Sequence, residues 1–241
     1  MRYGIFSDVH SNLEAFESVI KAMEGDKVDA YICAGDIVGY GADPSHCIRL
    51  TKKLTRNVVC GNHDWASAGR FGISYFNDCA KKAIYWTAQI LDEDEKAYLK
   101  NLKLIYEEED FLVVHGSLDK PEEFHYIMDS RDASRTFDAM RKKICFIGHS
   151  HRPVTFTKYG EGIRCTKPEK IELDKNASYI VNVGSVGQPR DRDPRACYVV
   201  YDADRKSIEI KRVSYDIKKA QSKILKAALP SFLAERLDAG R

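Results

Sequence analysis

The sequence predicts an α/β fold in which two sheets pack together with helices on the outside. Over the first third of the chain, short apolar runs of strand type alternate with helical patterns, which is typical of βαβ units and a mostly parallel sheet. From Pro153 onward, strand patterns follow one another closely, which favours an antiparallel sheet. Two packed sheets with outer helices are the arrangement that buries both patterns.

Composition and charge are those of an ordinary globular protein. Of the 241 residues, 44% are hydrophobic and 31% are charged, enough to bury a sizeable core. The 38 lysines and arginines against 36 acidic residues give a formal net charge of +2. A nucleic-acid coat or a polybasic membrane anchor needs a strong basic excess. We therefore expect no membrane partner, and the charge disfavours nucleic acid.

The chain is expected to reside in the cytoplasm. The N-terminal residues lack the charged and apolar regions of a signal peptide. Apolar runs such as 111–114 are far shorter than the roughly 18 residues of a membrane span. The seven cysteines form no C-x-x-C pair, and several of them lie in apolar strand-like runs as small hydrophobes. A reducing compartment is the simplest interpretation.

Strands and helices alternate up to residue 60. Three short apolar runs are expected to form strands: Tyr3–Ser7, Ala30–Ala34 and Asn57–Cys60. The first intervening helix has an apolar stripe from Leu13 and ends at Gly25, and Pro44 opens the second, over 45–54.

Residues 73–102 are expected to be wholly helical. Asp92 and Glu95 have the spacing of a capping box, so the acidic cluster there indicates a helix start rather than a metal site. We expect one domain over 1–241, with 65–103 as a candidate helical cap within it. Its aromatic residues could cover an active site or form a dimer contact, although aromatics at helical spacing more often belong to a core.

The remainder is rich in strands. The expected strands are Leu104–Glu107, Phe111–Val114, Ile144–Ile147, Val154–Thr157, Ile171–Leu173, Tyr179–Val183, Ala196–Tyr201 and Ile208–Val213. Helices are expected over 133–141 and 216–229, the second stopped by Pro230.

Polar clusters follow the strands of the first 151 residues. They are Asp8-Val9-His10, Gly35-Asp36, Gly61-Asn62-His63-Asp64, His115-Gly116 and Gly148-His149-Ser150-His151. In open α/β sheets, ligands bind outside the carboxyl ends of the strands, so these loops should converge. A single such cluster is more often structural, but five together predict one site.

The candidate ligands favour two metal ions. Seven residues offer nitrogen or oxygen donors and no thiolate: Asp8, His10, Asp36, Asn62, His115, His149 and His151. This set suits Mn, Fe, Zn, Co or Ni, of which we favour Mn or Fe, and differs from a structural zinc site. Seven donors exceed the needs of one ion and fit two divalent or trivalent ions if one carboxylate bridges. Such a pair forms a clamp for displacement at phosphorus.

These five blocks, in this order, resemble the calcineurin-like metallophosphoesterase superfamily, whose pattern is D-x-H, G-D, G-N-H-[DE], a lone H and G-H-x-H. The strand-rich remainder fits the four-layer α/β/β/α sandwich of that family, with two mixed sheets and helices outside. The resemblance implies one metal site from Asp8, His10 and His151, a second from Asn62, His115 and His149, and Asp36 as the bridge. It also implies that His63 is catalytic without binding metal. Asp64 could orient His63 or cap a helix.

The second block departs from the protein-phosphatase branch. That branch has G-D-x-V-D-R-G, whereas Gly39 and Tyr40 stand here in place of the acid and the phosphate-binding arginine. The chain is closer to small bacterial and archaeal phosphodiesterase-like members, some of which cleave dinucleoside polyphosphates. Arg190, in a turn-rich segment, could bind the phosphate instead, unless it pairs with Asp191 or Asp193. Arg152 and Tyr40 are further candidates for substrate contact.

The resemblance therefore implies a phosphoesterase that hydrolyses phosphodiester or phosphoanhydride bonds of small, nucleotide-type substrates by attack of a metal-bridged hydroxide. One alternative is a phosphomonoesterase, including a protein phosphatase. Another is a non-catalytic scaffold, since this fold also serves as a binding subunit of the retromer complex. A scaffold need not retain His63 and all seven ligands, and this chain does. A homo-oligomer is compatible with the sequence.

Overall fold

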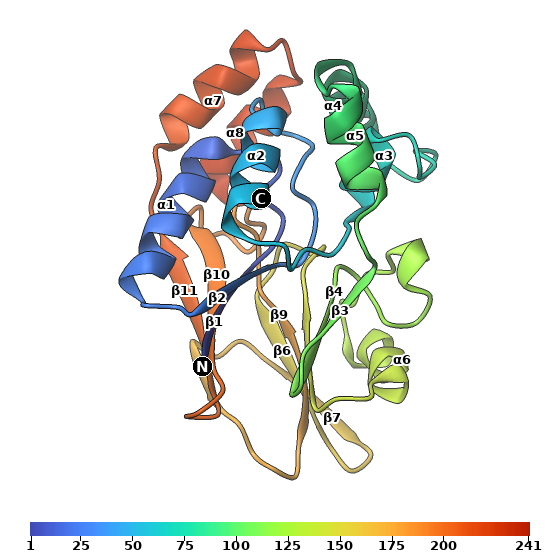
Figure 1. The fold of residues 1–241 in the computed structure, drawn as a ribbon, viewed down its shortest axis with the longest axis vertical. Helices are drawn as coiled ribbons and strands as arrows, with labels where there is room; N and C mark the ends of the chain where they lie inside the picture. Colours follow the sequence, from blue (N-terminus) through green and yellow to red (C-terminus); the bar gives the residue numbers. More distant parts are fainter.

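Two mixed sheets face each other in the computed structural model, which describes residues 1–241 (Figure 1). Across the first sheet the strands are β2 (Ala30–Cys33), β1 (Arg2–Phe6), β10 (Ala196–Asp202), β11 (Ser207–Val213) and β8 (Lys170–Glu172). Across the second they are β3 (Ile105–Glu107), β4 (Phe111–Val114), β5 (Ile144–Ile147), β9 (Ser178–Asn182), β6 (Val154–Tyr159) and β7 (Gly162–Thr166). The pairs β1–β2, β4–β5 and β5–β9 are parallel, and the other pairs are antiparallel.

Alternating side chains fill the layers on both sides of each sheet. In β10, Val199 and Tyr201 belong to the core between the sheets, whereas Tyr198 and Val200 belong to the core under the outer helices. The strands therefore carry apolar residues on both faces, as expected for sheets covered on both sides. Between the sheets, aromatic rings make edge-to-face contacts, such as Tyr3 against Phe111 at 5.0 Å between ring centroids.

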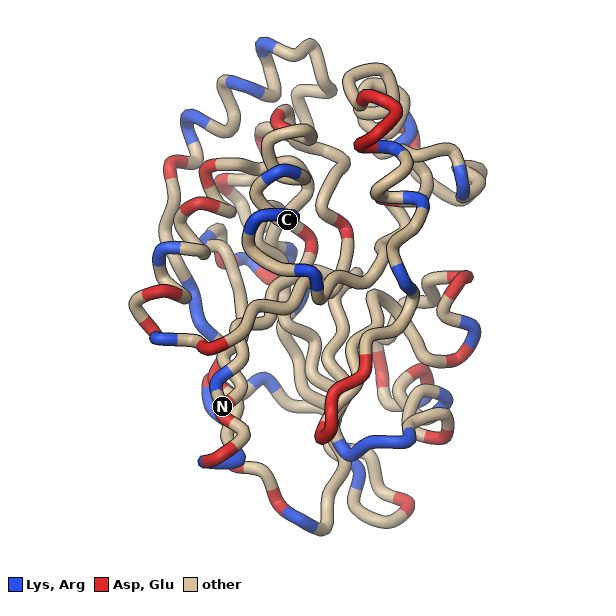
Figure 2. The backbone as a smooth tube through the Cα atoms, in the orientation of Figure 1, with Lys and Arg blue, Asp and Glu red and all other residues tan.

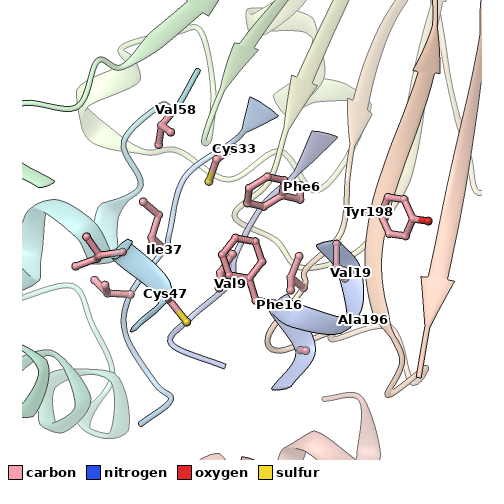
Figure 3. Close-up of a cluster of buried hydrophobic side chains, with 14 of the residues drawn as sticks. Phe6, Val9, Phe16, Val19, Cys33, Ile37, Cys47, Val58, Ala196 and Tyr198 are labelled. Carbon is pink, nitrogen blue, oxygen red and sulfur yellow. The ribbon is translucent and has the colours of Figure 1, made fainter. Parts of the chain in front are cut away.

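Helices cover the outer face of each sheet. On the first sheet lie α1 (Leu13–Gly25) and α2 (Pro44–Leu54), and Phe16 of α1 packs on Phe6 of β1 (Figure 3). On the second sheet lies α6 (Ser130–Ala139), whose Phe137 shares a cluster with strand residues of β4, β5, β6 and β9. The order of layers is helix, sheet, sheet, helix, so the predicted four-layer α/β/β/α sandwich is confirmed.

The other helices lie at one end of the two sheets. They are α3 (Asn62–Ser67), α4 (Asp78–Ile90), α5 (Glu93–Lys100), α7 (Ile217–Lys226) and α8 (Ser231–Ala239), with a single 3-10 turn at Pro121–Glu123 (Figure 1). A separate apolar cluster joins α4, α7 and α8 to Tyr40. This cluster connects the C-terminal helices to one of the loops at the carboxyl ends of the strands.

Local differences from the sequence expectations have physical causes. Residues 57–60 make only isolated bridges, at Val58 and Val59, because the chain enters α3 directly afterwards. The expectation that 73–102 is wholly helical is wrong over 73–77, which form a turn, and the rest divides into two helices, since Leu91 is extended and Asp92 starts α5 as its N-cap. The capping box between Asp92 and Glu95 is present.

Two elements of the C-terminal half were not expected. Strand β7 is largely exposed and lacks an apolar pattern. Helix α8 begins after Pro230, which caps its start, whereas α7 already ends at Lys226. Proline is tolerated at the first turn of a helix because it has no N–H to satisfy there.

Charged residues of both signs are interspersed along the chain (Figure 2), in keeping with the net charge of +2. No helix combines the length and the apolar character needed to span a membrane.

Candidate active site

The five predicted loops converge where the carboxyl ends of the two sheets meet. They bring together Asp8, His10, Asp36, Asn62, His63, His115, His149 and His151, and each of these residues is between 0% and 7% exposed. Asp8 and Asp36 follow strands of the first sheet, whereas His115, His149 and His151 follow strands of the second. Burying so many polar groups is costly unless they find partners.

Asp8 lies at the centre of one group of donors. Its Oδ1 is 3.2 Å from Nε2 of His151 and 3.6 Å from Nε2 of His10. The two histidine Nε2 atoms are 3.1 Å apart. These three residues form one of the clusters able to hold a metal ion.

Asp36 lies between this group and a second one. Its Oδ2 is 3.2 Å from Nε2 of His115 and 3.6 Å from Nε2 of His10. With His115 and His149 it forms another cluster able to hold a metal. Because its carboxylate contacts both groups, Asp36 has the position that a bridging ligand requires.

Backbone carbonyls orient three of the histidines. The Nδ1 atoms of His10, His115 and His151 lie 3.0, 2.7 and 2.6 Å from the carbonyl oxygens of Val38, Ala34 and Gln188. A carbonyl only accepts, so each Nδ1 carries the hydrogen and donates it. Each Nε2 atom therefore faces the interior of the site, as in a metal-ligating histidine.

The donor set fits metal ions. Three buried polar atoms at the site have no hydrogen-bond partner: Asp8 Oδ1, Asn62 Oδ1 and His115 Nε2. In addition, the Nε2 atoms of His10 and His151 face each other as acceptors at 3.1 Å. Bound cations would satisfy all of these atoms. Without them, each buried atom would need a water molecule or a protein group as its hydrogen-bond partner.

Most of these groups favour the unprotonated form that binds metal. The pKa values of Asp8 and Asp36 lie below the usual range because the surrounding histidines outweigh the effect of burial. Burial and the charge of Arg190 lower the pKa of His151 to about 3. His115 differs, because the Asp36 carboxylate overcomes burial and raises its pKa to about 9. Metal binding at His115 would therefore displace a proton.

The ligand loops adopt left-handed backbone conformations. Positive φ angles occur at Asp8, His10, Asp36, His149 and His151, with values between 48° and 67°. Each such residue costs of order 1–3 kcal/mol and persists only where the surroundings enforce it. Backbone hydrogen bonds do so here, including Asp8 N to Gly35 O at 2.9 Å and His10 N to Asp36 O at 3.0 Å.

Asp64 fixes two of the loops rather than orienting His63. Its Oδ1 accepts from the backbone N–H groups of Ile37 and Val38, and its Oδ2 accepts from those of Asp36 and Gly61. The contact with Gly61 caps α3. Burial and the Asp36 charge raise the pKa of Asp64 to about 7. Of the two roles open from the sequence, these bonds support the cap.

His63 lies beside the candidate ligands with its Nδ1 buried and unpartnered. Its backbone N–H donates to Asp36 Oδ1 at 2.8 Å, and its ring lies 4.4 Å from that of Tyr40. Burial, assisted by neighbouring positive charges, holds its pKa well below the usual range. Donor atoms of His10, Asp36 and His63 lie within 4.8 Å of one another. This geometry allows His63 as a ligand or as a proton donor.

A cavity of about 270 Å³ opens beside these residues and includes His63, His149, Tyr40 and Arg190 in its lining. Arg190 donates through Nη2 to Gln188 Oε1 at 2.8 Å, and its Nε is buried without an acceptor. It does not pair with an acid, since Asp191 pairs with Arg212 and Asp193 with Arg195. Its guanidinium therefore has donors free for an anion.

The other two substrate candidates differ in position. Tyr40 lies in the cavity, with the Arg190 guanidinium carbon 5.6 Å from its ring centroid. Arg152 is exposed and outside the cavity, and its Nε donates to the Arg190 carbonyl at 3.0 Å. Arg152 thus supports the loop that carries Arg190.

Sequence reasoning missed two residues of the site. The Tyr126 ring stacks on His149 at 3.7 Å between centroids. Gln188 holds His151 through its carbonyl and Arg190 through its side chain. Gln188 lies in the turn-rich segment that ends at Arg190, and this sequence pattern could have identified Gln188 as a candidate. For Tyr126 no pattern in the sequence points to the site.

Comparisons with known proteins agree with this picture. A family model described as the calcineurin-like phosphoesterase superfamily domain matches residues 1–206. The uncharacterized protein MJ0912 of Methanocaldococcus jannaschii is 39% identical over 242 residues, which cover 98% of this chain and 97% of that protein.

Solved structures show the same fold. The crystal structure of a metallophosphoesterase from Sphaerobacter thermophilus matches with a TM-score of 0.90 and 38% identity, covering 100% of this chain and 99% of that one. The hypothetical protein PH1004 from Pyrococcus horikoshii matches with a TM-score of 0.80 and 21% identity, over 100% of this chain and 98% of that one.

Proposed function

We infer the function of this chain from its family and its site together. The chain belongs to the calcineurin-like phosphoesterase superfamily. Its loops assemble candidate metal-ligand clusters. Membership supports a metal-dependent phosphoesterase. We propose that it uses two metal ions, with Mn or Fe favoured, to hydrolyse phosphodiester or phosphoanhydride bonds of small nucleotide substrates.

One observation carries the dinuclear proposal. Two donor clusters, Asp8–His10–His151 and Asp36–His115–His149, lie side by side, and Asp36 contacts His10 of the first. Seven buried donors are more than one ion of four to six ligands can use. Asn62, whose Oδ1 is buried without a partner, completes the second group in this proposal.

The metal ions, when bound, would supply a water of lowered pKa and stabilise charge on the phosphate oxygens. The protein residues have separate tasks. Arg190 would bind a phosphate oxygen with its free donors. His63 would hold a proton for the leaving oxygen, since the charge of a bound phosphate raises the pKa of a neighbouring imidazole. Tyr40, packed on the His63 ring, would keep that ring in position.

The shape of the site supports a small substrate. The cavity of about 270 Å³ is near the lower end of the size range of small-molecule sites, which supports a small substrate. We also propose that residues 65–103 act as the cap of a single domain over 1–241. In support, Phe71, Tyr75 and Phe76 from this segment line the cavity.

The test is a hydrolysis assay on metal-stripped protein reloaded with Mn²⁺, comparing bis-p-nitrophenyl phosphate with p-nitrophenyl phosphate. We expect a clear preference for the diester. A preference for the monoester would favour a phosphomonoesterase or protein phosphatase instead. If neither ester is cleaved although the metals are bound, the scaffold alternative is favoured.

The role of His63 has its own test. His63→Ala should lower kcat by about 10²–10⁴-fold, the usual contribution of a general acid, and leave the metal content unchanged. His46→Ala is the matched control, because His46 is exposed on α2 and lies outside the site. Loss of metal from His63→Ala would reassign His63 as a ligand.

A further inference from the structure

The cavity beside the metal-ligand clusters has a lining unusually rich in aromatic side chains. They are Tyr40, Phe71, Tyr75, Phe76, Phe124 and Tyr126. Phe71 packs edge-to-face on Phe124 at 5.2 Å between centroids, and Phe76 packs in the same way on His63 at 5.0 Å. These inner rings are covered by packing against neighbouring rings. Tyr126 and Tyr75 do not belong to that packing and are 50% and 95% exposed.

The aromatic ring of Tyr126 is held in position by stacking on one of its faces. One face of its ring lies on the imidazole of His149, at 3.7 Å between centroids and 18° between planes. His149 is itself 5% exposed and held in the ligand cluster. The stacking fixes the plane of the Tyr126 ring directly beside the reacting centre, and half of its surface stays open. A flat π-system placed there can stack on the ring with little loss of side-chain entropy.

Tyr75 lies in the segment between α3 and α4 and also borders the cavity. At 95% exposure it packs against nothing in the protein, so packing does not explain an aromatic residue at this position. Its neighbour Phe76 reaches inward to His63. Tyr75 is therefore available as a second aromatic surface at the opening of the same cavity.

We propose that Tyr126, assisted by Tyr75, stacks on the base of a nucleotide substrate and so selects nucleoside esters over base-free phosphate esters. This inference rests on the proposed phosphoesterase function and names the residues that give it substrate preference. The only acid of the cavity lining, Glu123, pairs with His125 at 2.8 Å. That carboxylate is therefore engaged, and because every base has a π-face, stacking on the tyrosine rings accepts any of the bases.

The test uses two esters with the same leaving group. Thymidine 5′-monophosphate p-nitrophenyl ester carries a base, whereas ethyl p-nitrophenyl phosphate does not. Since stacking contributes about 1–3 kcal/mol per base, the wild type should prefer the nucleoside ester by roughly tenfold or more in kcat/KM. The preference should appear mainly in KM, because stacking is equal in ground and transition states.

Variants test whether the two tyrosines cause the preference for the nucleoside ester. Tyr126→Leu and Tyr75→Ala should each reduce the ratio of kcat/KM values by roughly threefold or more, and the double variant should bring it close to one. Tyr126→Phe should retain it, because stacking needs the ring and not the hydroxyl. Tyr85→Ala is the matched control, since Tyr85 is 60% exposed on α4 and does not line this cavity.

The outcomes separate this inference from the function on which it rests. If the wild type cleaves both esters equally well, or if the variants keep the preference, the inference is wrong and the phosphodiesterase activity stands. If neither ester is cleaved, the proposed function fails, and calorimetric binding of thymidine 5′-monophosphate against ethyl phosphate decides the inference instead. Tighter binding of the nucleotide by the wild type, lost in Tyr126→Leu, supports stacking, whereas equal binding overturns it.

Discussion

The carboxylate of Asp64 holds two loops of the candidate site through hydrogen bonds from the backbone. Asp64 makes no contact with the cavity, yet its two oxygens accept from four backbone N–H groups in two different loops. One of these loops carries Asp36, and the other leads into α3, which carries His63. The position of the Asp36 carboxylate is thus set by a neighbouring carboxylate, Asp64, that is itself 0% exposed. Replacing this oxygen-only acceptor by a group with N–H donors would place donors against donors.

We therefore expect Asp64→Asn to destabilise the protein by about 1–3 kcal/mol, the cost of leaving buried donors unpaired. It should also weaken metal binding, because Asp36 loses its support. Denaturant unfolding and metal titration check both effects. Asp94→Asn is a suitable control, since Asp94 is exposed on α5. A variant with normal stability and metal affinity would show that Asp64 does not hold the loops.

Among the elements, the contact between α1 and α7 includes ion pairs whose carboxylate is buried while their lysines remain partly exposed. Glu14 of α1 is 5% exposed and lies 2.6 Å from Lys223 Nζ and 3.1 Å from Lys219 Nζ. Lys223 also contacts Asp43, 2.8 Å away, just before α2. Burial disfavours the Glu14 carboxylate, but the two lysines lower its pKa below the usual value. The ion pair thereby joins the C-terminal helices to the first layer of the sandwich.

Glu14→Gln should lower the free energy of unfolding by about 1–3 kcal/mol at neutral pH, since two lysines lose their charged partner. Because the pKa of Glu14 is lower in the folded state, its contribution is present above about pH 4.3, the ordinary Glu value. It is lost as the pH falls through the folded-state pKa. The variant should therefore lose stability less steeply than the wild type on acidification.

Urea unfolding at neutral and at acid pH measures this difference. Glu17→Gln, at an exposed position on the same helix without an ion pair, controls for the loss of charge. Parallel pH profiles for the wild type and Glu14→Gln would contradict a stabilising role of the pair.

At the scale of the whole molecule, the site depends on the way the two sheets meet. Asp8 and Asp36 come from the first sheet, and they contact His151 and His115 from the second. The backbone N–H of His149 also donates to Asp8 Oδ2 across this boundary, at 3.0 Å. A cation at these donors would link the sheets as well as serve the chemistry.

This arrangement explains what could be predicted from the sequence. Polar clusters after apolar strand patterns identify the loops because parallel strands of one sheet end at the same edge, so Asp8 and Asp36 could be predicted to meet. That His115 joins them depends on how the second sheet packs on the first. Arg190 could be identified as a candidate from its turn-rich segment, but its lack of an acidic partner could not.

The remaining features depend on contacts between distant segments, which leave no local pattern. Tyr126 reaches His149 from another loop, and α8 is held by apolar contacts with α4 and α7 rather than by a distinctive stripe. Likewise, β7 is specified by pairing with β6 and not by its own exposed residues.

The dinuclear site is tested by the number of metal ions that one chain holds. The measurement is elemental analysis of protein stripped with chelator, saturated with Mn²⁺ and freed of excess metal by gel filtration. We expect two ions per chain in the wild type and a reduced number in His115→Ala, which loses one of the unpartnered buried nitrogens of the site. One ion or none bound by the wild type would contradict the dinuclear site.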